Sequence, residues 1–230
     1  MHYIFDVDGT LTPSRGKMDQ KFSNWFEHFQ THHATYMVTG SDKDKTIEQV
    51  GWGHYNSCIR VYNCSGNDVW ASGSHVRTNK MVLPDRWETI LGRMLENSKS
   101  PVKCGNHFDL RPGLLNFSTL GRNAKQEERS AYKAFDDSDA ERPQLAEQLQ
   151  KIWPDYDITV AGETGIDIVL KGYDKSQIID DFESLDEITF FGDKMEPTGN
   201  DYTLALEVAQ AGGTVHQVKS WEDTWRILQG

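Results

Sequence analysis

Two aspartates near the amino terminus carry the clearest chemical signal in this sequence. Residues 5–12 read Phe-Asp-Val-Asp-Gly-Thr-Leu-Thr, so that Asp6 and Asp8 stand one residue apart where an apolar strand runs into a Gly-Thr turn. Side chains two positions apart in a strand project to the same side, so both carboxylates can converge on one Mg²⁺ ion and one phosphoryl group. One carboxylate can attack phosphorus while the other protonates the leaving oxygen. The spacing predicts phosphoryl transfer. The alternative is an acidic turn after an edge strand.

The surrounding pattern alternates strands with helices. The expected elements are a strand over residues 3–7, a helix over 20–29, a strand over 36–38, a helix over 43–50 and a strand over 187–191. This alternation predicts a parallel sheet wound with right-handed crossovers. Polar residues follow three of the strands, as Asp6, Thr39 and Asp193 illustrate. The carboxyl edge of such a sheet is the usual place for a ligand.

The pattern changes in the middle of the chain. Helices are expected over residues 87–97 and 141–152, and strands over 108–110, 114–118 and 166–170. We therefore expect an α/β protein in which residues 1–80 and 179–230 form a core and residues 81–178 form an inserted α/β cap. The acidic stretch 136–141 is interpreted as a solvated approach to a helix.

Composition excludes several classes of protein. The net charge of −11 disfavours a nucleic-acid partner, because a polyanion-binding surface needs a clustered basic excess. No apolar run approaches the roughly 20 residues of a membrane-spanning helix. The three cysteines lack metal-ligand spacing and are odd in number, which favours reduced thiols and a cytoplasmic location.

The motif Asp-x-Asp-Gly-Thr-Leu-Thr resembles the signature of the haloacid dehalogenase (HAD) superfamily of aspartate-based phosphotransferases. This resemblance implies a Rossmann-like HAD core with a parallel sheet. It also implies that Asp6 is the nucleophile that becomes an aspartyl phosphate, and that Asp8 is the general acid and base.

A second resemblance covers residues 108–129, which carry Arg111, Arg122 and Arg129 at the spacing of the eukaryotic-type phosphomannomutases and end in Gln-Glu-Glu-Arg. It implies that these arginines hold the sugar phosphate that is distal to the nucleophile. A guanidinium stays ionised and offers paired donors to phosphate oxygens, so the role is physically reasonable. The alternative is that Arg122 and Arg129 pair with neighbouring glutamates on a helical face.

The same resemblance assigns roles to further positions. It implies that Arg15 binds substrate, that Asp167 contacts sugar hydroxyls and that Lys175 steadies the nucleophile. Thr39 would bind the transferring phosphate, and Gly165, which replaces a serine of the family, would retain only a backbone contact. The implied Mg²⁺ ligands are Asp6, Asp8, Asp193 and Asp201.

The function implied is a phosphomannomutase that interconverts mannose 1-phosphate and mannose 6-phosphate through an aspartyl phosphate and a hexose 1,6-bisphosphate, within GDP-mannose biosynthesis. The family also suggests a homodimer joined through the caps. Two alternatives stay open: a Mg²⁺-dependent sugar-phosphate phosphatase, in which water attacks the aspartyl phosphate, and a non-catalytic phosphosugar-binding protein. The preference between mannose and glucose phosphates is open as well.

Overall fold

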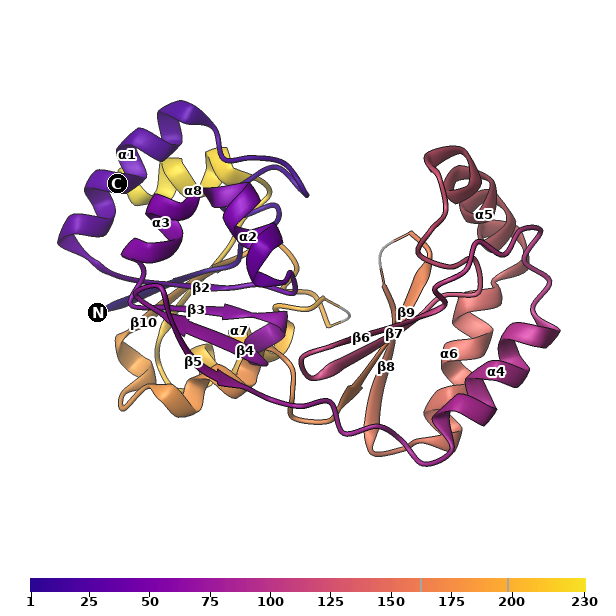
Figure 1. Ribbon diagram of the computed structural model, residues 1–230. Helices are drawn as coiled ribbons and strands as arrows, with labels where there is room; N and C mark the ends of the chain where they lie inside the picture. Colours follow the sequence, from indigo (N-terminus) through magenta and orange to yellow (C-terminus); the bar gives the residue numbers. More distant parts are fainter. Residues whose placement is uncertain (162, 198) are drawn as a thin grey trace. The chain divides into compact units, whose positions relative to one another are not determined.

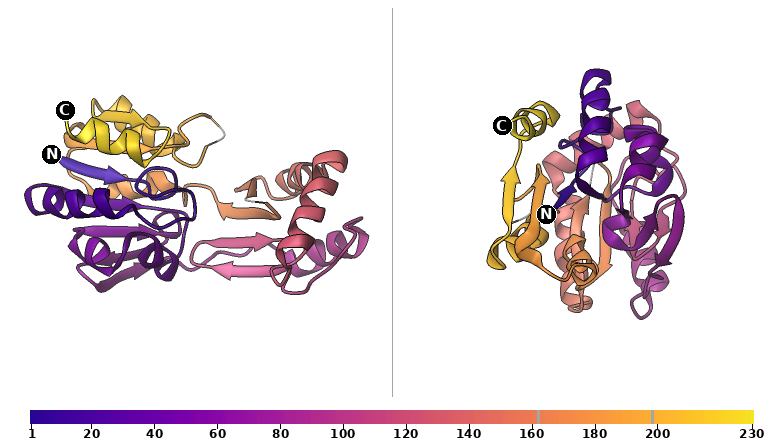
Figure 2. Two further views of the ribbon diagram at one scale, coloured as in Figure 1. Left: turned by 90° about the horizontal axis from the view of Figure 1, so that it is seen from above. Right: turned by 90° about the vertical axis from the view of Figure 1, so that its left-hand side faces the viewer.

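The computed structural model describes residues 1–161, 163–197 and 199–230, which form two compact units (Figure 1). The first unit combines Met1–Asn79 with Gly172–Gly230, and the second is Lys80–Lys171. Both termini therefore lie in the first unit (Figure 2). Each unit contains a sheet and helices, which confirms the expected α/β class.

The first unit is built on a seven-stranded sheet in the order β11-β10-β1-β2-β3-β4-β5. The strands are β1 (His2–Phe5), β2 (Ala34–Val38), β3 (Arg60–Asn63), β4 (Asp68–Ala71), β5 (Ser74–Thr78), β10 (Ile188–Gly192) and β11 (Thr214–Gln217). All neighbours from β11 to β3 are parallel, whereas β4 and β5 are added antiparallel. Phe5 stands in register with Met37 on one side and Phe191 on the other. The carboxyl ends of β1, β2 and β10 therefore lie at one edge.

Helices cover both faces of this sheet (Figure 1). One layer consists of α1 (Gln20–His32), α2 (Lys43–Val50), α3 (Trp52–Ser57) and α8 (Trp221–Leu228); the other contains α7 (Tyr202–Gln210) and the short helices η2 (Lys175–Asp181) and η3 (Leu185–Glu187). Helix α1 shows why these elements form: Asp19 caps its amino end, and Phe22, Phe26 and Phe29 recur at helical spacing and are buried. Alternate strand residues face opposite layers, as Phe5 and Ile4 do.

The second unit is a four-stranded antiparallel sheet in the order β6-β7-β9-β8, with three helices. Its elements are α4 (Trp87–Asn97), β6 (Phe108–Arg111), β7 (Leu114–Phe117), α5 (Gln126–Asp139), α6 (Glu141–Ile152), β8 (Tyr156–Ala161) and β9 (Gly165–Leu170). Helices α4 and α6 pack against one face through Leu91, Leu149 and the sheet residues Leu115 and Ile168. Strand β8 and helix α5 were not expected from the sequence.

The interpretation of residues 136–141 as a solvated stretch is wrong for Asp136. Its side chain is buried and accepts hydrogen bonds from the backbone N–H and the guanidinium of Arg142, at 2.7 and 2.8 Å. Ala140 between them adopts the left-handed conformation, with φ of 52°, which turns the chain from α5 into α6. A buried ion pair therefore joins these two helices, because the turn brings Arg142 back over the end of α5.

The chain crosses between the units at Asn79–Lys80 and at Lys171–Gly172. The boundary expected after residue 178 falls inside η2, which packs against α7 in the first unit. Among the described residues, none of the helices is both long enough and apolar enough to cross a membrane.

Candidate active site

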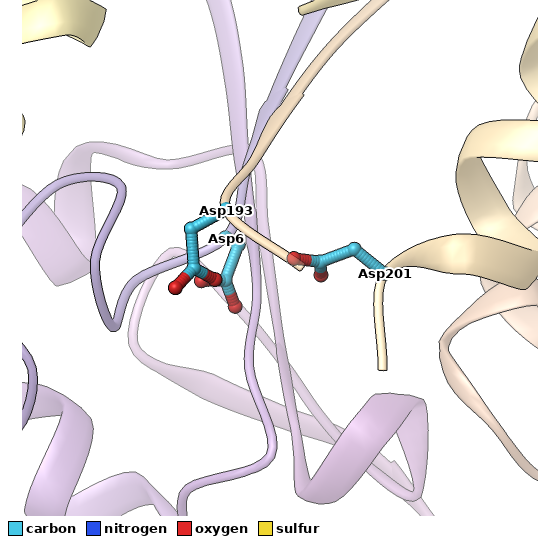
Figure 3. Close-up of side chains that lie close together, drawn as sticks. All are labelled: Asp6, Asp193 and Asp201. Atoms are coloured by element: carbon cyan, nitrogen blue, oxygen red, sulfur yellow. The ribbon is translucent and has the colours of Figure 1, made fainter. Parts of the chain in front are cut away.

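Three aspartates from separate parts of the first unit meet at the carboxyl edge of its sheet (Figure 3). Asp6 directly follows β1 and donates its backbone N–H to Phe191 on β10 at 2.9 Å. Asp193 directly follows β10, and Asp201 precedes α7. One carboxylate oxygen from each of the three lies within 4.8 Å of the others. Parallel pairing of β1 with β10 brings the first two together, although the sequence separates them widely.

Lys175 supplies the positive charge of this cluster. Its side chain is fully buried, and its ammonium lies 2.5 Å from Asp6 Oδ1 and 2.7 Å from Asp201 Oδ1. The other oxygen of Asp201 accepts the backbone N–H of Lys194 at 3.1 Å. Lys175 therefore contacts Asp6, the carboxylate that the sequence resemblance implies to be the nucleophile.

Burial governs the electrostatics of the cluster. It raises the pKa of Asp6 to about 7, with a further increase from Asp201, although Lys175 acts in the opposite direction. Burial alone would lower the pKa of Lys175, but the carboxylates of Asp201 and Asp6 outweigh it and raise this pKa. Burial likewise raises the pKa of Asp193. One lysine thus incompletely offsets three carboxylates.

A divalent cation would offset the negative charge that Lys175 leaves on the three carboxylates. The three donors are carboxylate oxygens, the ligands that Mg²⁺ prefers, and two of the three residues are buried. The acidic cluster therefore fits a hard divalent metal ion, held by Asp6, Asp193 and Asp201.

Two glycines allow the cluster to close. Gly9 has φ of 81°, and a Cβ atom there would overlap the carboxylate of Asp193. A Cβ atom on Gly192 would lie 2.7 Å from Asp201 Oδ2. The glycine in the Asp-Gly-Thr turn is thus required both by its backbone conformation and by the close approach of Asp193.

Asp8 lies apart from the three clustered carboxylates. Its Oδ1 accepts the backbone N–H of Arg15 at 2.5 Å and the Nε2 amide of Gln49 at 2.9 Å. Arg15 is thus brought to Asp8 through its backbone, and its side chain is exposed. Gln49 was missed by sequence reasoning. Its signal is a polar residue on the buried face of α2, where Thr46 and Val50 are also buried.

Thr39 occupies the end of the neighbouring strand. It directly follows β2, its side chain is buried, and its hydroxyl accepts the backbone N–H of Ser41 at 3.1 Å. Its own N–H is donated to Tyr62 on β3 at 2.9 Å. The parallel register of β1 and β2 thus places Thr39 at the same sheet edge as Asp6.

The arginines singled out in the sequence gather in the second unit. Arg111 and Arg122 both pair with Asp109 on β6, at 2.7 and 3.4 Å. Burial lowers the pKa of Arg122, and the positive charges of Arg111 and Arg129 lower it further, whereas Asp109 raises it. Three neighbouring guanidinium groups with two nearby carboxylates, Asp109 and Asp167, form a group of charges that favours an anion.

The alternative in which Arg122 and Arg129 pair with neighbouring glutamates is wrong for the described ranges, where neither forms an ion pair with Glu127 or Glu128. Glu128 instead accepts the backbone N–H of Lys125 at the start of α5, at 2.6 Å. Glu128 therefore caps the helix and pairs with neither arginine.

A row of polar side chains crosses the sheet beside the arginines. Asp109 on β6, Asn116 on β7 and Asp167 on β9 stand in register, and Asn116 donates its amide to Asp167 at 2.6 Å. Burial raises the pKa of Asp167, although this hydrogen bond and the arginines lower it. A Cβ atom on Gly165 would overlap the Asn116 side chain. A side chain at position 165 would therefore clash with Asn116 as it lies here, a contact that sequence reasoning missed.

The expected site residues thus form two groups. The first unit brings together Asp6, Asp193, Asp201 and Lys175, with Asp8 and Arg15 in the loop after β1 and Thr39 directly after β2. The second unit brings together Arg111, Arg122, Arg129 and Asp167, with Gly165 on the same strand as Asp167.

Comparison with known proteins places this chain among relatives of one kind. The profile of the eukaryotic phosphomannomutase family matches residues 22–230. A phosphomannomutase of Drosophila melanogaster is 31% identical, with 98% of this chain and 92% of the relative covered. One of Arabidopsis thaliana is 30% identical, with 96% and 92% covered. The chain belongs to the eukaryotic phosphomannomutase family, which confirms the resemblance read from its residues.

Solved structures agree on the fold. A haloacid dehalogenase-like hydrolase from Bacteroides thetaiotaomicron superposes with a TM-score of 0.63 at 12% identity, covering 99% of this chain and 98% of the other. A trehalose-6-phosphate phosphatase related protein has a TM-score of 0.58 at 16% identity, with 100% and 96% covered. At such identities the likeness concerns the fold, and it confirms the expected HAD architecture.

Proposed function

We propose that this chain is a phosphomannomutase, which interconverts mannose 1-phosphate and mannose 6-phosphate through an aspartyl phosphate on Asp6. One observation supports a mutase over a hydrolase: the first unit holds the nucleophile cluster, and the second unit holds a separate group of three arginines. A hydrolase needs one phosphate site, whereas a mutase that handles a hexose 1,6-bisphosphate needs two.

In the first half-reaction, an oxygen of Asp6 attacks the phosphorus of a hexose 1,6-bisphosphate and the bond to the sugar oxygen breaks. Asp8 gives its proton to that oxygen, and the sugar monophosphate is released from the reacting centre. In the second half, Asp8 removes the proton from the hydroxyl of a sugar monophosphate, which attacks the aspartyl phosphate and frees Asp6. The hydrogen bonds to Asp8 from Arg15 and Gln49 hold this carboxyl in place.

Mg²⁺ is the proposed cofactor, held by Asp6, Asp193 and Asp201, and when bound it would offset the negative charge of carboxylates and phosphate. The hydrogen bonds to Asp8 favour an acid–base role for it over the role of metal ligand. Lys175 lowers the pKa of Asp6 against the effect of burial and so favours its ionised form, and the buried hydroxyl of Thr39 is available to the transferring phosphate.

The arginine group fixes the phosphate that does not react. Arg111, Arg122 and Arg129 offer donors to a dianion, and Asp167 accepts from a sugar hydroxyl while Asn116 keeps it oriented. Gly165 offers its backbone beside them. Which ring hydroxyl is held decides between mannose and glucose phosphates.

The oligomeric state and the cellular location proposed here are those expected from the sequence and its family resemblance. In this proposal the protein is a cytoplasmic homodimer joined through the second unit, and it binds phosphorylated hexoses without nucleic acid or membrane. Three free cysteines and a net charge of −11 support this setting. Light scattering after size exclusion would measure the mass, and deletion of the second unit should yield a monomer if that unit joins the copies.

The direct test incubates the protein with Mg²⁺, mannose 1-phosphate and glucose 1,6-bisphosphate, and measures both mannose 6-phosphate and inorganic phosphate. A mutase forms the former without accumulating the latter. Inorganic phosphate without mannose 6-phosphate would instead identify a phosphatase, and neither product would favour a binding protein. Asp6→Asn should abolish both activities.

The role of the arginines has its own control. Arg122→Ala should impair the mutase reaction far more than hydrolysis of a small generic phosphate ester, because that ester has no second phosphate. Arg226→Ala, which removes an exposed arginine paired with Asp223, should change neither. Equal losses of both activities in Arg122→Ala would contradict the assigned role.

A further inference from the structure

Helix α5 is held on the second unit chiefly by polar contacts. Among the described residues, the apolar core of this unit draws mainly on α4, α6 and the four strands, and none of its members lies on α5. The buried residues of α5 are Tyr132 and Asp136, and both carry a polar group. Asp136 pairs with Arg142 at the start of α6. The docking of α5 therefore depends on how these two polar side chains are bound.

Tyr132 begins a chain of hydrogen bonds that ends on a carboxylate. The Tyr132 hydroxyl lies 2.8 Å from Thr119 Oγ1, which donates to Glu141 Oε2 at 2.9 Å. A threonine hydroxyl has a single proton. Because Thr119 gives this proton to Glu141, Tyr132 is the donor to Thr119. Both hydroxyl-bearing residues are buried, so the loss of a partner would leave a polar group unpaired, at a cost in free energy.

Glu141 anchors this chain because its other oxygen is bound as well. Its Oε1 accepts the Ser98 hydroxyl and the backbone N–H of Lys99, both at 2.8 Å. Ser98 and Lys99 directly follow α4, which belongs to the apolar core, and Glu141 is the first residue of α6. Donors from separate segments thus engage both carboxylate oxygens and fix their orientation. Glu141 thereby ties Thr119 and Tyr132 to the packed part of the unit.

The two hydroxyl groups lie close in sequence to two of the arginines. Thr119 precedes Arg122 by three residues in the loop after β7, and Tyr132 follows Arg129 by three residues on α5. Residues three apart on a helix are neighbours on its surface. The chain of hydrogen bonds from Tyr132 to Glu141 therefore links the loop that carries Arg122 to the helix that carries Arg129.

The spacing of these arginines needs such a link. Burial lowers the pKa of Arg122, and the positive charges of Arg111 and Arg129 act in the same direction, so the guanidinium groups repel one another. Asp109 ties Arg122 to Arg111, but in the described part of the chain no ion pair holds Arg129. Its Nε donates to Ala124 O, just before its own helix, at 3.4 Å. The docking of α5 therefore sets the position of Arg129 relative to Arg122.

We propose that Glu141 is a positioning residue for the arginine group: through Thr119 and Tyr132 it holds α5 so that Arg129 and Arg122 bind one phosphate dianion together. This inference rests on the proposed function, in which these arginines hold the phosphate that does not react. Without the anchor, repulsion between the guanidinium groups favours their separation, and the phosphate loses donors. Glu141 acts through its neighbours and not on the phosphate itself.

The test measures the affinity of the full chain for mannose 1-phosphate by isothermal titration calorimetry in EDTA. Without a metal ion the acidic cluster repels a phosphate, so binding reports on the arginines. We expect Glu141→Ala and Tyr132→Phe to weaken this binding about tenfold, roughly the effect of losing one hydrogen bond to a charged group. Tyr132→Phe removes a single oxygen atom and keeps the buried ring, so it decides the test should Glu141→Ala not fold.

A double-mutant cycle separates positioning from a general loss of structure. If Tyr132 acts through Arg129, adding Tyr132→Phe to Arg129→Ala should weaken binding by less than about twofold. An equal loss in both backgrounds would overturn the positioning role. In the mutase assay, KM for mannose 1-phosphate should rise in Tyr132→Phe while kcat stays unchanged, because the lost contact is made equally in the ground state and the transition state.

Tyr156→Phe is the matched control. It removes another hydroxyl from a buried tyrosine of the second unit, one that donates to Val82 O at 3.1 Å, and it should leave the affinity for mannose 1-phosphate unchanged. Weakening by Tyr156→Phe equal to that by Tyr132→Phe would show a general effect of the lost hydroxyl and would overturn the role of Glu141.

Because binding is measured without turnover, the role of Glu141 and the mutase activity are tested separately. If the wild type forms mannose 6-phosphate and both variants bind mannose 1-phosphate as tightly as the wild type does, the positioning role is overturned and the proposed function stands. If the wild type releases only inorganic phosphate and both variants bind more weakly, the proposed function fails and the positioning role is supported. A wild type that does not bind mannose 1-phosphate in EDTA would overturn the positioning role, whichever product it forms.

Discussion

Replacing Lys175 with methionine tests the electrostatic account of the acidic cluster. Methionine keeps most of the length and apolar volume of lysine, so the substitution removes chiefly the charge and the hydrogen bonds to Asp6 and Asp201. Both partners are buried, and a broken buried pair leaves uncompensated charge that water cannot reach. Such a change costs about 3–5 kcal/mol.

The measurement is urea unfolding at pH 8, above the pKa of about 7 of Asp6, first in EDTA and then in saturating Mg²⁺. We expect Lys175→Met to lose about 3–5 kcal/mol in EDTA. Mg²⁺ should restore more stability to Lys175→Met than to the wild type, because a cation bound only by the folded state now meets three uncompensated carboxylates.

Lys151→Met is the matched control, because the same substitution there breaks an ion pair of similar length, 2.6 Å, in which both side chains are about 70% exposed. Water and salt screen such a pair, so stability should change little. A loss in Lys175→Met no larger than in Lys151→Met, or an equal response of Lys175→Met and wild type to Mg²⁺, would refute the account.

Two further predictions concern residues that act through their neighbours. Gln49→Leu should lower kcat by roughly tenfold to a hundredfold, the equivalent of one hydrogen bond to a charged group. KM should change little, because the substitution disturbs the orientation of Asp8 and leaves the substrate-binding residues in place. An unchanged kcat would contradict this prediction. Burial between α1 and α3 lowers the pKa of His54, whose Nδ1 donates to Gln30 and whose Nε2 accepts from Ser23. His54 therefore binds a proton more readily in the unfolded state than in the folded state. Its contribution to the free energy of unfolding is complete above pH 6.5 and declines below that pH. Between pH 5 and 7.5, the free energy of unfolding in urea should fall less steeply with decreasing pH in His54→Asn than in the wild type. Parallel pH profiles of the two proteins would exclude this role of His54.

Features that depend on nearby residues were predicted well from the sequence. The spacing of Asp6 and Asp8, the glycine after them and the strand that leads into them follow from the two-residue period of a strand and the needs of a tight turn. The polar residues that follow β2 and β10 were likewise predicted to share one edge of the sheet with Asp6, because parallel strands end together.

Contacts between distant segments were harder to predict from the sequence. The side chain of Asp8 accepts the amide of Gln49, which lies 41 residues further along the chain, and nothing in the sequence indicated this partner. Asp136 looked solvated in the sequence because its neighbours are acidic, whereas a left-handed residue after α5 buries it against Arg142. Nothing in local composition reports such a turn.

By itself the sequence determined which side chains could carry chemistry, since residue type and short-range spacing are properties of the chain alone. Only the tertiary structure decided which of them meet. Lys175 reaches Asp6 across 169 residues because η2 packs against α7 and η1 (Cys64–Gly66), and Asp193 joins them because β10 pairs with β1 in one register. Register and helix packing are set by burial of apolar faces over the whole unit, so the geometry of the site emerges only when the core has formed.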